Sequence, residues 1–260
     1  QNGLDALALT DHGNMNGLAY QVLHGRKMVE QGKDFKPIYG VEAYFVPSLE
    51  GWRNEYEQAM QDKKKARELA KGKQSGATVE DSAESKRATN NILKRRSHLI
   101  LLAQNQTGLN NLFKLVSESY KEENFYRYPR MDYEMLEKYG EGVIAASACL
   151  GGVYASDFWG SSTYDEEGNR TGFNADKALE SMRETTRRML DVFGDRWYAE
   201  LQWNNIPEQH HLNKLIVQVA QEHNVKLIST ADSHYPNPDA WKDRELYNRL
   251  GWLGKGRPSW

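Results

Sequence analysis

Short apolar runs alternate with longer amphipathic segments along most of this chain, and this alternation constrains its fold more than any other feature. The runs have the length of buried strands, and the segments between them carry apolar residues at helical spacing. The expected strands are 4–10, 38–46, 98–103, 142–146, 197–201 and 226–230, and the expected helices cover 18–29, 109–116, 178–193 and 212–220. The sequence therefore predicts an α/β fold with mostly parallel strands.

Charge and cysteine content exclude several classes of protein. The formal net charge of -2 gives the whole chain no nucleic-acid-binding signature, so any DNA contact requires a local basic patch or a metal. The single cysteine, Cys149, rules out an internal disulfide and fits a reducing, cytoplasmic compartment. No apolar run approaches the roughly 20 residues that cross a bilayer, so we expect no membrane contact.

Two polar stretches interrupt the alternation. Residues 50–96 contain the run Lys63-Lys64-Lys65 and few large apolar side chains, which predicts a solvated, partly helical insertion. An alternative is a basic arm that contacts DNA or a partner subunit. The shorter stretch, 161–174, is expected to form a loop.

Ionisable and sulfur-containing side chains occur near the ends of these strands. They are Asp11, His12, Glu42, His98, Cys149, Glu200, Asp232 and His234. In a parallel α/β barrel the carboxyl ends of the strands meet on one face, where functional sites are built. Histidine nitrogen, carboxylate oxygen and thiolate sulfur are ligands for divalent metals. The pattern therefore favours a metal site.

Each residue, taken alone, has a simpler interpretation. A carboxylate inside an apolar run, such as Glu42, is typical of a buried ion pair. His98 fits a hydrogen-bonded core histidine, and Cys149 fits a small buried apolar side chain. Asp11 fits a helix cap, and the segment 232–236 fits a turn.

The joint pattern favours the metal interpretation over these single ones. Three of the seven histidines, His12, His98 and His234, fall at strands beside acidic or sulfur partners. The other four fall in predicted helices, where ordinary solvated or capping roles are expected; they are His24, His210, His211 and His223. A cysteine nucleophile at Cys149 is less favoured, because the same thiol fits the metal set.

Several blocks of sequence resemble a known family. Thr10-Asp11-His12-Gly13-Asn14-Met15, Gly40-Val41-Glu42-Ala43-Tyr44 and the block 230–235 resemble motifs of the PHP (polymerase and histidinol phosphatase) superfamily. The blocks 97–112, 126–132, 147–152 and 197–209 resemble its polymerase branch, the PHP domains of bacterial and phage C-family replicative DNA polymerases. The resemblance covers nearly the whole chain outside 50–90 and 161–174.

The resemblance implies a distorted (β/α)7 TIM-like barrel with a metal cluster at the carboxyl ends of its strands. It implies two or three divalent ions (Zn, Mn or Mg) and no role as a ligand for Glu200. The implied ligands are His12, Glu42, His98, Cys149, Asp232 and His234. Asp11 is a further candidate ligand, and Asp11, His12 and Asp232 are the candidate catalytic residues.

One motif of the family is not found. Its first motif, a His-x-His, would stand before the start of this chain, so we expect that the chain is cut short and that the first barrel strand is missing. We expect a PHP metal-binding domain over 1–250 and the start of a linker toward a polymerase core over 251–260. A barrel with unpaired strand edges is expected to be weakly stable on its own.

The resemblance implies metal-dependent phosphodiester hydrolysis of the 3′–5′ exonuclease type, within a polymerase that acts in DNA replication. Arg95, Arg96 and Arg130 are candidate contacts for phosphate. The implied partners are DNA, through the polymerase, and replisome subunits such as a proofreading exonuclease or a sliding clamp. One alternative is a non-catalytic scaffold that stabilises the polymerase and docks a proofreading subunit. Another is a free-standing phosphatase of the histidinol-phosphate type.

Overall fold

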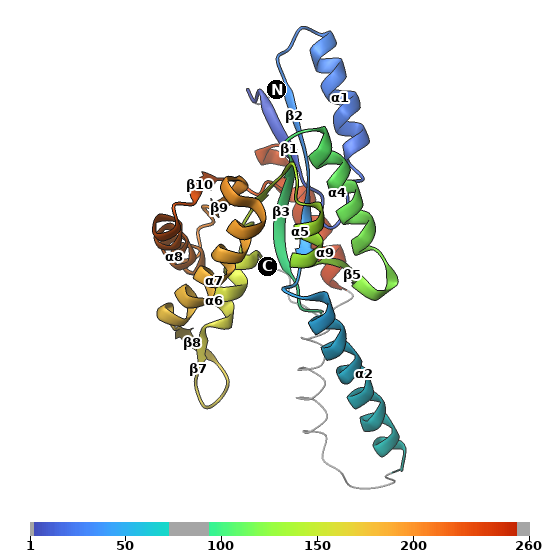
Figure 1. Ribbon diagram of the computed structural model, residues 1–260, viewed down its shortest axis with the longest axis vertical. Helices are drawn as coiled ribbons and strands as arrows, with labels where there is room; N and C mark the ends of the chain where they lie inside the picture. The colour runs from blue at the N-terminus through green and yellow to red at the C-terminus, as the bar shows by residue number, and fades with distance from the viewer. Residues whose placement is uncertain (1–2, 73–93, 254–260) are drawn as a thin grey trace.

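A single curled sheet, flanked by helices, forms a half-barrel in the computed structural model, which describes residues 3–72 and 94–253 (Figure 1). Its strands are β1 (Ala6–Leu9), β2 (Lys36–Phe45), β3 (Ser97–Ala103), β4 (Phe125–Tyr126), β5 (Tyr128–Met131), β6 (Val143–Ala146), β9 (Trp197–Leu201) and β10 (Lys226–Ser229). Their order is β10-β9-β6-β3-β2-β5-β4, and β1 pairs with the first half of β2. The expected α/β barrel-like fold is therefore confirmed.

The six predicted strands all form, and each end lies within two residues of its predicted position. The strand directions depart from the prediction at one place, because β3 runs antiparallel to both β2 and β6. The first residues of β3, rather than its last, therefore lie beside the carboxyl end of β2. This reversal brings His98, the second residue of β3, to the same end of the sheet as the ends of β1, β2 and β6.

Helices cover the outer face of the sheet and connect its strands (Figure 1). They are α1 (Leu18–Glu30), α2 (Leu49–Gly72), α4 (Gln106–Ser119), α5 (Tyr133–Tyr139), α6 (Val153–Gly160), α7 (Ala175–Phe193), α8 (Pro207–His223) and α9 (Trp241–Leu253), with short 3-10 turns at Glu122–Asn124, Gly194–Arg196 and Pro238–Ala240. The four helices predicted from apolar spacing correspond to α1, α4, α7 and α8. None of the helices within residues 3–72 and 94–253 has the length and apolar content to cross a membrane.

The alternation of side chains along β2 separates the core from the site. Val41, Ala43 and Phe45 are at most 2% exposed and belong to the main core cluster beneath the helices. Successive residues of a strand point to opposite faces. Glu42 and Tyr44 therefore face the concave side of the half-barrel, so the pattern that builds the core also places the carboxylate of Glu42 in the site.

The polar insertion begins as a long helix that projects from the body of the protein (Figure 1). Its first turns are held by a small cluster of Val46, Leu49 and Trp52. The helical part of the prediction is confirmed over α2. Residues 73–93 lie outside the described residues, so the predicted basic arm is untested there.

The second polar stretch, 161–174, was expected to form a loop, and this prediction is wrong in detail. It forms a hairpin of β7 (Ser162–Tyr164) and β8 (Arg170–Phe173). Asp165 closes the turn, because its Oδ1 accepts the backbone amide of Asn169 at 2.6 Å. Strands this short, three and four residues in a polar context, carry little of the apolar alternation that marks a strand.

Asp157 in α6 gives a testable pH dependence of stability. Thr185 Oγ1 donates to its carboxylate at 2.8 Å, and burial raises its pKa to about 6. The unfolded chain releases this proton first, so stability falls as pH rises from 3.8 to about 6 and stays lower above that range. Asp157→Asn should therefore raise the free energy of unfolding by about 2 kcal/mol at pH 8.

The measurement is urea unfolding of both proteins at the two ends of this range. In acid, where Asp157 is neutral, the variant and the wild type should be nearly equal in stability. A gain of the same size in acid and at pH 8 would show that the charge of Asp157 is not the cause.

Candidate metal centre

Backbone pairing brings the first two candidate ligands together. His12 lies just beyond β1 and forms a parallel bridge with Glu42 of β2. Gly13 donates its amide to the carbonyl of Glu42 at 2.8 Å, and the amide of Glu42 donates to the carbonyl of Asp11 at 3.1 Å. The register of β1 on β2 therefore fixes His12 beside Glu42.

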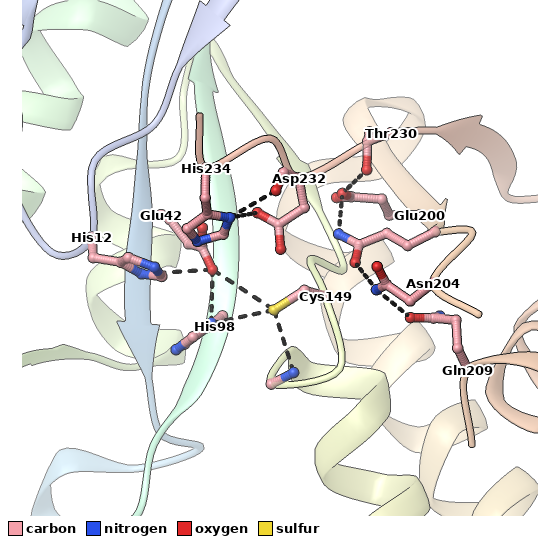
Figure 2. A network of polar contacts seen from close by, with 12 residues as sticks. His12, Glu42, His98, Cys149, Glu200, Asn204, Gln209, Thr230, Asp232 and His234 are labelled. Atoms are coloured by element: carbon pink, nitrogen blue, oxygen red, sulfur yellow. Dashed lines mark hydrogen bonds and ion pairs between the residues drawn. The ribbon is translucent and has the colours of Figure 1, made fainter. Parts of the chain in front are cut away.

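The third candidate, His98, completes a compact group with these two (Figure 2). His98 Nδ1 lies 2.7 Å from Glu42 Oε1, and His12 Nδ1 lies 3.7 Å from the same oxygen. One potential ligand atom from each of the three residues lies within 4.8 Å of the others. Glu42 is 4% exposed, so this carboxylate is buried between two imidazole rings.

Cys149 brings a sulfur atom to the same group from the end of β6. Its Sγ lies 3.4 Å from His98 Nδ1 and 3.9 Å from Glu42 Oε1. The amide of Gly151 also approaches the sulfur, at 3.3 Å. Four residues from four strands therefore converge on one point, as the dashed lines in Figure 2 show.

The spacing of these atoms fits a divalent metal. Ligand atoms bound to zinc at about 2.0–2.3 Å in a tetrahedral arrangement are about 3.3–3.8 Å apart. The Cys149–His98, His12–Glu42 and Cys149–Glu42 distances of 3.4, 3.7 and 3.9 Å are close to that range. The His98–Glu42 distance of 2.7 Å is that of a hydrogen bond and would have to lengthen.

Asp232 and His234 lie at the edge of this group, on the loop that follows β10 (Figure 2). The ring of His234 lies 6.2 Å from that of His12, between centroids. His234 Nδ1 approaches the carbonyl oxygen of Asp232 at 2.8 Å and its carboxylate Oδ1 at 3.8 Å. The side chain of His234 is 37% exposed and that of Asp232 is 29% exposed, whereas the side chain of Glu42 is 6% exposed.

Asp11, the remaining candidate, faces the start of α1. Its Oδ2 accepts the amide of Gly17, the N-cap position of that helix, at 2.8 Å. The N-cap of α1 is Gly17 and no side chain caps it, so Asp11 binds the segment before the helix and is not the helix cap that the sequence left open. Within the described chain, Asp11 is not part of the compact group formed by His12, Glu42 and His98.

The protonation states suit metal binding at Glu42 and His12 and oppose it at Cys149. Burial alone would raise the pKa of Glu42, but the hydrogen bond from His98 and the nearby His12 outweigh it and lower that pKa. Burial lowers the pKa of His12 although Glu42 opposes the shift, so neutral imidazole is favoured. Burial raises the pKa of Cys149 to about 12, so its thiol needs a bound cation to ionise near neutral pH.

The three candidate phosphate contacts have different surroundings. Arg95 pairs with Glu55 at 2.8 Å, and the Arg96 guanidinium lies 3.8 Å over the ring of Tyr128. Arg130 is completely buried, so the prediction that it contacts phosphate is wrong. Its guanidinium instead donates to the backbone carbonyls of Arg95, Tyr126 and Tyr128.

Sequence reasoning missed two features beside the group. The ring of Tyr44 lies 6.0 Å from that of His12, nearly parallel to it, and 5.5 Å from that of His98. Glu200 carries a buried polar network that the candidate set left out. The alternation of β2 could have identified Tyr44, since it lies on the same face as Glu42.

Comparison with known proteins agrees with the fold. Residues 1–204 match the family model described as the PHP domain. The chain belongs to the PHP family. It is similar to DNA polymerase III subunit alpha of Aquifex aeolicus, with 37% identity over 237 residues, and to that of Campylobacter jejuni, with 31% identity over 237 residues. These alignments cover 91% and 90% of this chain but only 16% of each relative.

Proposed function

We propose that this chain is the PHP domain of a DNA polymerase III alpha subunit and that its ligand group binds divalent metal for phosphodiester hydrolysis of the 3′–5′ exonuclease type. The convergence of His12, Glu42, His98 and Cys149 from four strands carries the proposal. Two further ligands, Asp232 and His234, are proposed at its edge. The similarity to polymerase subunits supports a role in DNA replication.

The imidazole and thiolate donors favour zinc, whereas the carboxylate donors suit manganese or magnesium. Two or three bound ions would lower the pKa of bound water and offset charge on a phosphate. Within this chain, Glu42 and neutral His12 hold the centre. Asp232 is the proposed proton acceptor for water, a role that its partial exposure, 29% of the side chain, supports. Asp11 and His12 remain predictions as catalytic residues.

Replacing Asp232, whose carboxylate is partly exposed, tests the proposed hydrolytic role. Asp232→Asn in the protein of full natural length should lower Mn²⁺-dependent release of nucleotides from a 3′-labelled single strand by at least about 100-fold. The assay omits deoxynucleotides, so polymerisation does not contribute. Asp239→Asn, a change at an exposed position on the same segment, is the matched control and should leave the rate unchanged. Equal rates for Asp232→Asn and wild type would contradict the catalytic proposal.

A docking role is the second candidate. Two large apolar side chains three residues apart on α1 are exposed, Tyr20 at 79% and Leu23 at 56%, as on a surface that binds protein. In that case the domain would dock a replisome subunit, such as a proofreading exonuclease or a sliding clamp, beside DNA in the cytoplasm. Metal-binding variants would then leave its function intact. The similarity to polymerase subunits favours both candidates over a free-standing phosphatase.

A further inference from the structure

Glu200 is a buried carboxylate that the proposed ligand set does not use. It lies in β9, between β6 and β10, and is 4% exposed. Across the part of the chain that the structure describes, no lysine, arginine or histidine pairs with it. A buried charge without a cation is costly unless hydrogen bonds satisfy it, so the bonds of Glu200 indicate its role.

Those bonds reach the two loops that carry proposed ligands. Thr230 Oγ1 donates to Glu200 Oε1 from the loop after β10. On the other side, the backbone of Ala148 hydrogen-bonds to the carboxylate, and the amide of Glu200 donates to Ser147 Oγ at 2.9 Å. Ala148 precedes Cys149, and Thr230 stands two residues before Asp232, so Glu200 ties both ligand loops to β9.

Both loops contain a residue with positive φ. Ala148 has φ +62°, in the left-handed region that alanine rarely adopts, and Asp232 has φ +47°, which aspartate tolerates better than most residues. Such conformations persist only where the surrounding structure holds them. Without the bonds to Glu200, both loops would be free to relax toward ordinary backbone angles, and Cys149 and Asp232 would move.

A chain of amide side chains holds Glu200 in turn. Gln202 Nε2 donates to Glu200 Oε1 at 3.3 Å, and Asn213 Nδ2 of α8 donates to the carbonyl of Gln202 at 2.7 Å. Gln209 Nε2 donates to Asn213 Oδ1 at 2.9 Å, and Asn204 Nδ2 donates to Gln209 Oε1 at 3.2 Å. Figure 2 shows this network running from Thr230 and Glu200 to Asn204 and Gln209. Gln209 and Asn213 belong to α8, so this helix anchors the network and, through Gln202, the carboxylate of Glu200.

We propose that Glu200 is a positioning residue that holds Cys149 and Asp232 against the His12–Glu42–His98 group, so that they can bind the same metal centre. This inference rests on the proposed metal-binding function. Glu200 is not itself a ligand in this proposal, because donors from Thr230, Gln202 and Ala148 occupy its carboxylate.

Cobalt titration of the full natural-length protein tests the proposal. Thiolate bound to Co²⁺ gives a charge-transfer absorption in the near ultraviolet, so the spectrum reports the position of Cys149 directly. Wild type should show this band. Glu200→Ala should bind Co²⁺ at least about 10-fold more weakly and lose the band, as expected when a partner outside the ligand shell is removed. Glu200→Gln keeps an acceptor oxygen and should restore most of the band.

A second variant and a control keep the test decisive. Thr230→Val removes one donor to Glu200 without opening a large cavity, and it should also weaken the band. This variant serves as the test if Glu200→Ala fails to fold. Glu208→Gln, which breaks a pair with Arg170 outside the site, should change nothing. Absence of Co²⁺ binding by wild type would overturn the metal function and this inference together. A wild-type band that persists in Glu200→Ala, or in Thr230→Val where Glu200→Ala is unfolded, would overturn the inference alone.

Discussion

Replacing Glu42 by glutamine is expected to weaken Zn²⁺ and Mn²⁺ binding by at least about 100-fold. Its Oε1 lies 2.7 Å from His98 Nδ1, 3.7 Å from His12 Nδ1 and 3.9 Å from Cys149 Sγ, so this one oxygen joins the group. Glutamine has nearly the same volume but carries no charge. The loss should therefore come from charge and ligand strength rather than from altered packing.

Isothermal titration with Zn²⁺ and Mn²⁺ measures this effect, and circular dichroism checks that the variant stays folded. Glu55→Gln is a suitable control, because Glu55 pairs with Arg95 and not with the ligand group. The control should bind metal like the wild type. Affinities for Glu42→Gln within a few-fold of wild type would mean that metal, if it binds, does so elsewhere.

Replacing Arg130 by methionine is expected to lower the free energy of unfolding by about 3–5 kcal/mol. The side chain is completely buried and donates to the carbonyls of Arg95, Tyr126 and Tyr128 at 3.1, 3.0 and 2.9 Å. Its guanidinium also lies 4.2 Å over the ring of Trp52. Methionine fills similar space but leaves buried carbonyl oxygens without donors.

Urea unfolding in metal-free buffer measures this loss of stability without a contribution from bound ions. Arg187→Met, at a side chain that is 58% exposed, is the matched control and should change the free energy of unfolding by less than about 0.5 kcal/mol. A similarly small change for Arg130→Met would show that these buried hydrogen bonds contribute little. The burial of Arg130 lowers its pKa to about 10, so it stays charged near neutral pH.

The sequence was most informative about strands that are buried on one face. The apolar run around Val41, Glu42 and Ala43 located β2, and its period-two alternation would also have separated the core side of that strand from the site side. The sequence pattern could not predict that β3 runs antiparallel to its neighbours, because a strand has the same hydrophobic pattern in either direction. β4 and β5 were missed because runs of two and four residues are too short for a period to show.

Local pattern also explains which parts of the site were predicted. His12, His98 and Cys149 stand at or just beyond strand ends, and the topology brings them to Glu42 inside β2. Asp11 stands beside His12 in the sequence, but its carboxylate turns toward the start of α1 and accepts the amide of Gly17 there. Sequence adjacency does not fix the direction of a side chain, so only the three-dimensional structure separates these two roles.

Arg130 shows the same limit for charged residues. In the sequence, Arg130 of the segment Tyr128-Pro129-Arg130 suggests a surface residue that contacts phosphate, because arginine is rarely buried. Here three backbone carbonyls converge on one guanidinium, one from Arg95 before β3 and two from Tyr126 and Tyr128 of the β4–β5 hairpin. Such convergence depends on the tertiary fold and leaves no periodic trace in the sequence.

The most direct test of the central claim, that the His12–Glu42–His98–Cys149 group is a metal centre, is the metal content of the purified protein. Elemental analysis would follow equilibration with Zn²⁺ or Mn²⁺ and removal of loosely bound ions. The wild type should retain a stoichiometric amount of metal, and a variant that lacks both His98 and Cys149 should retain almost none. A wild type that is folded but free of metal, or a variant that keeps the full amount, would contradict the claim.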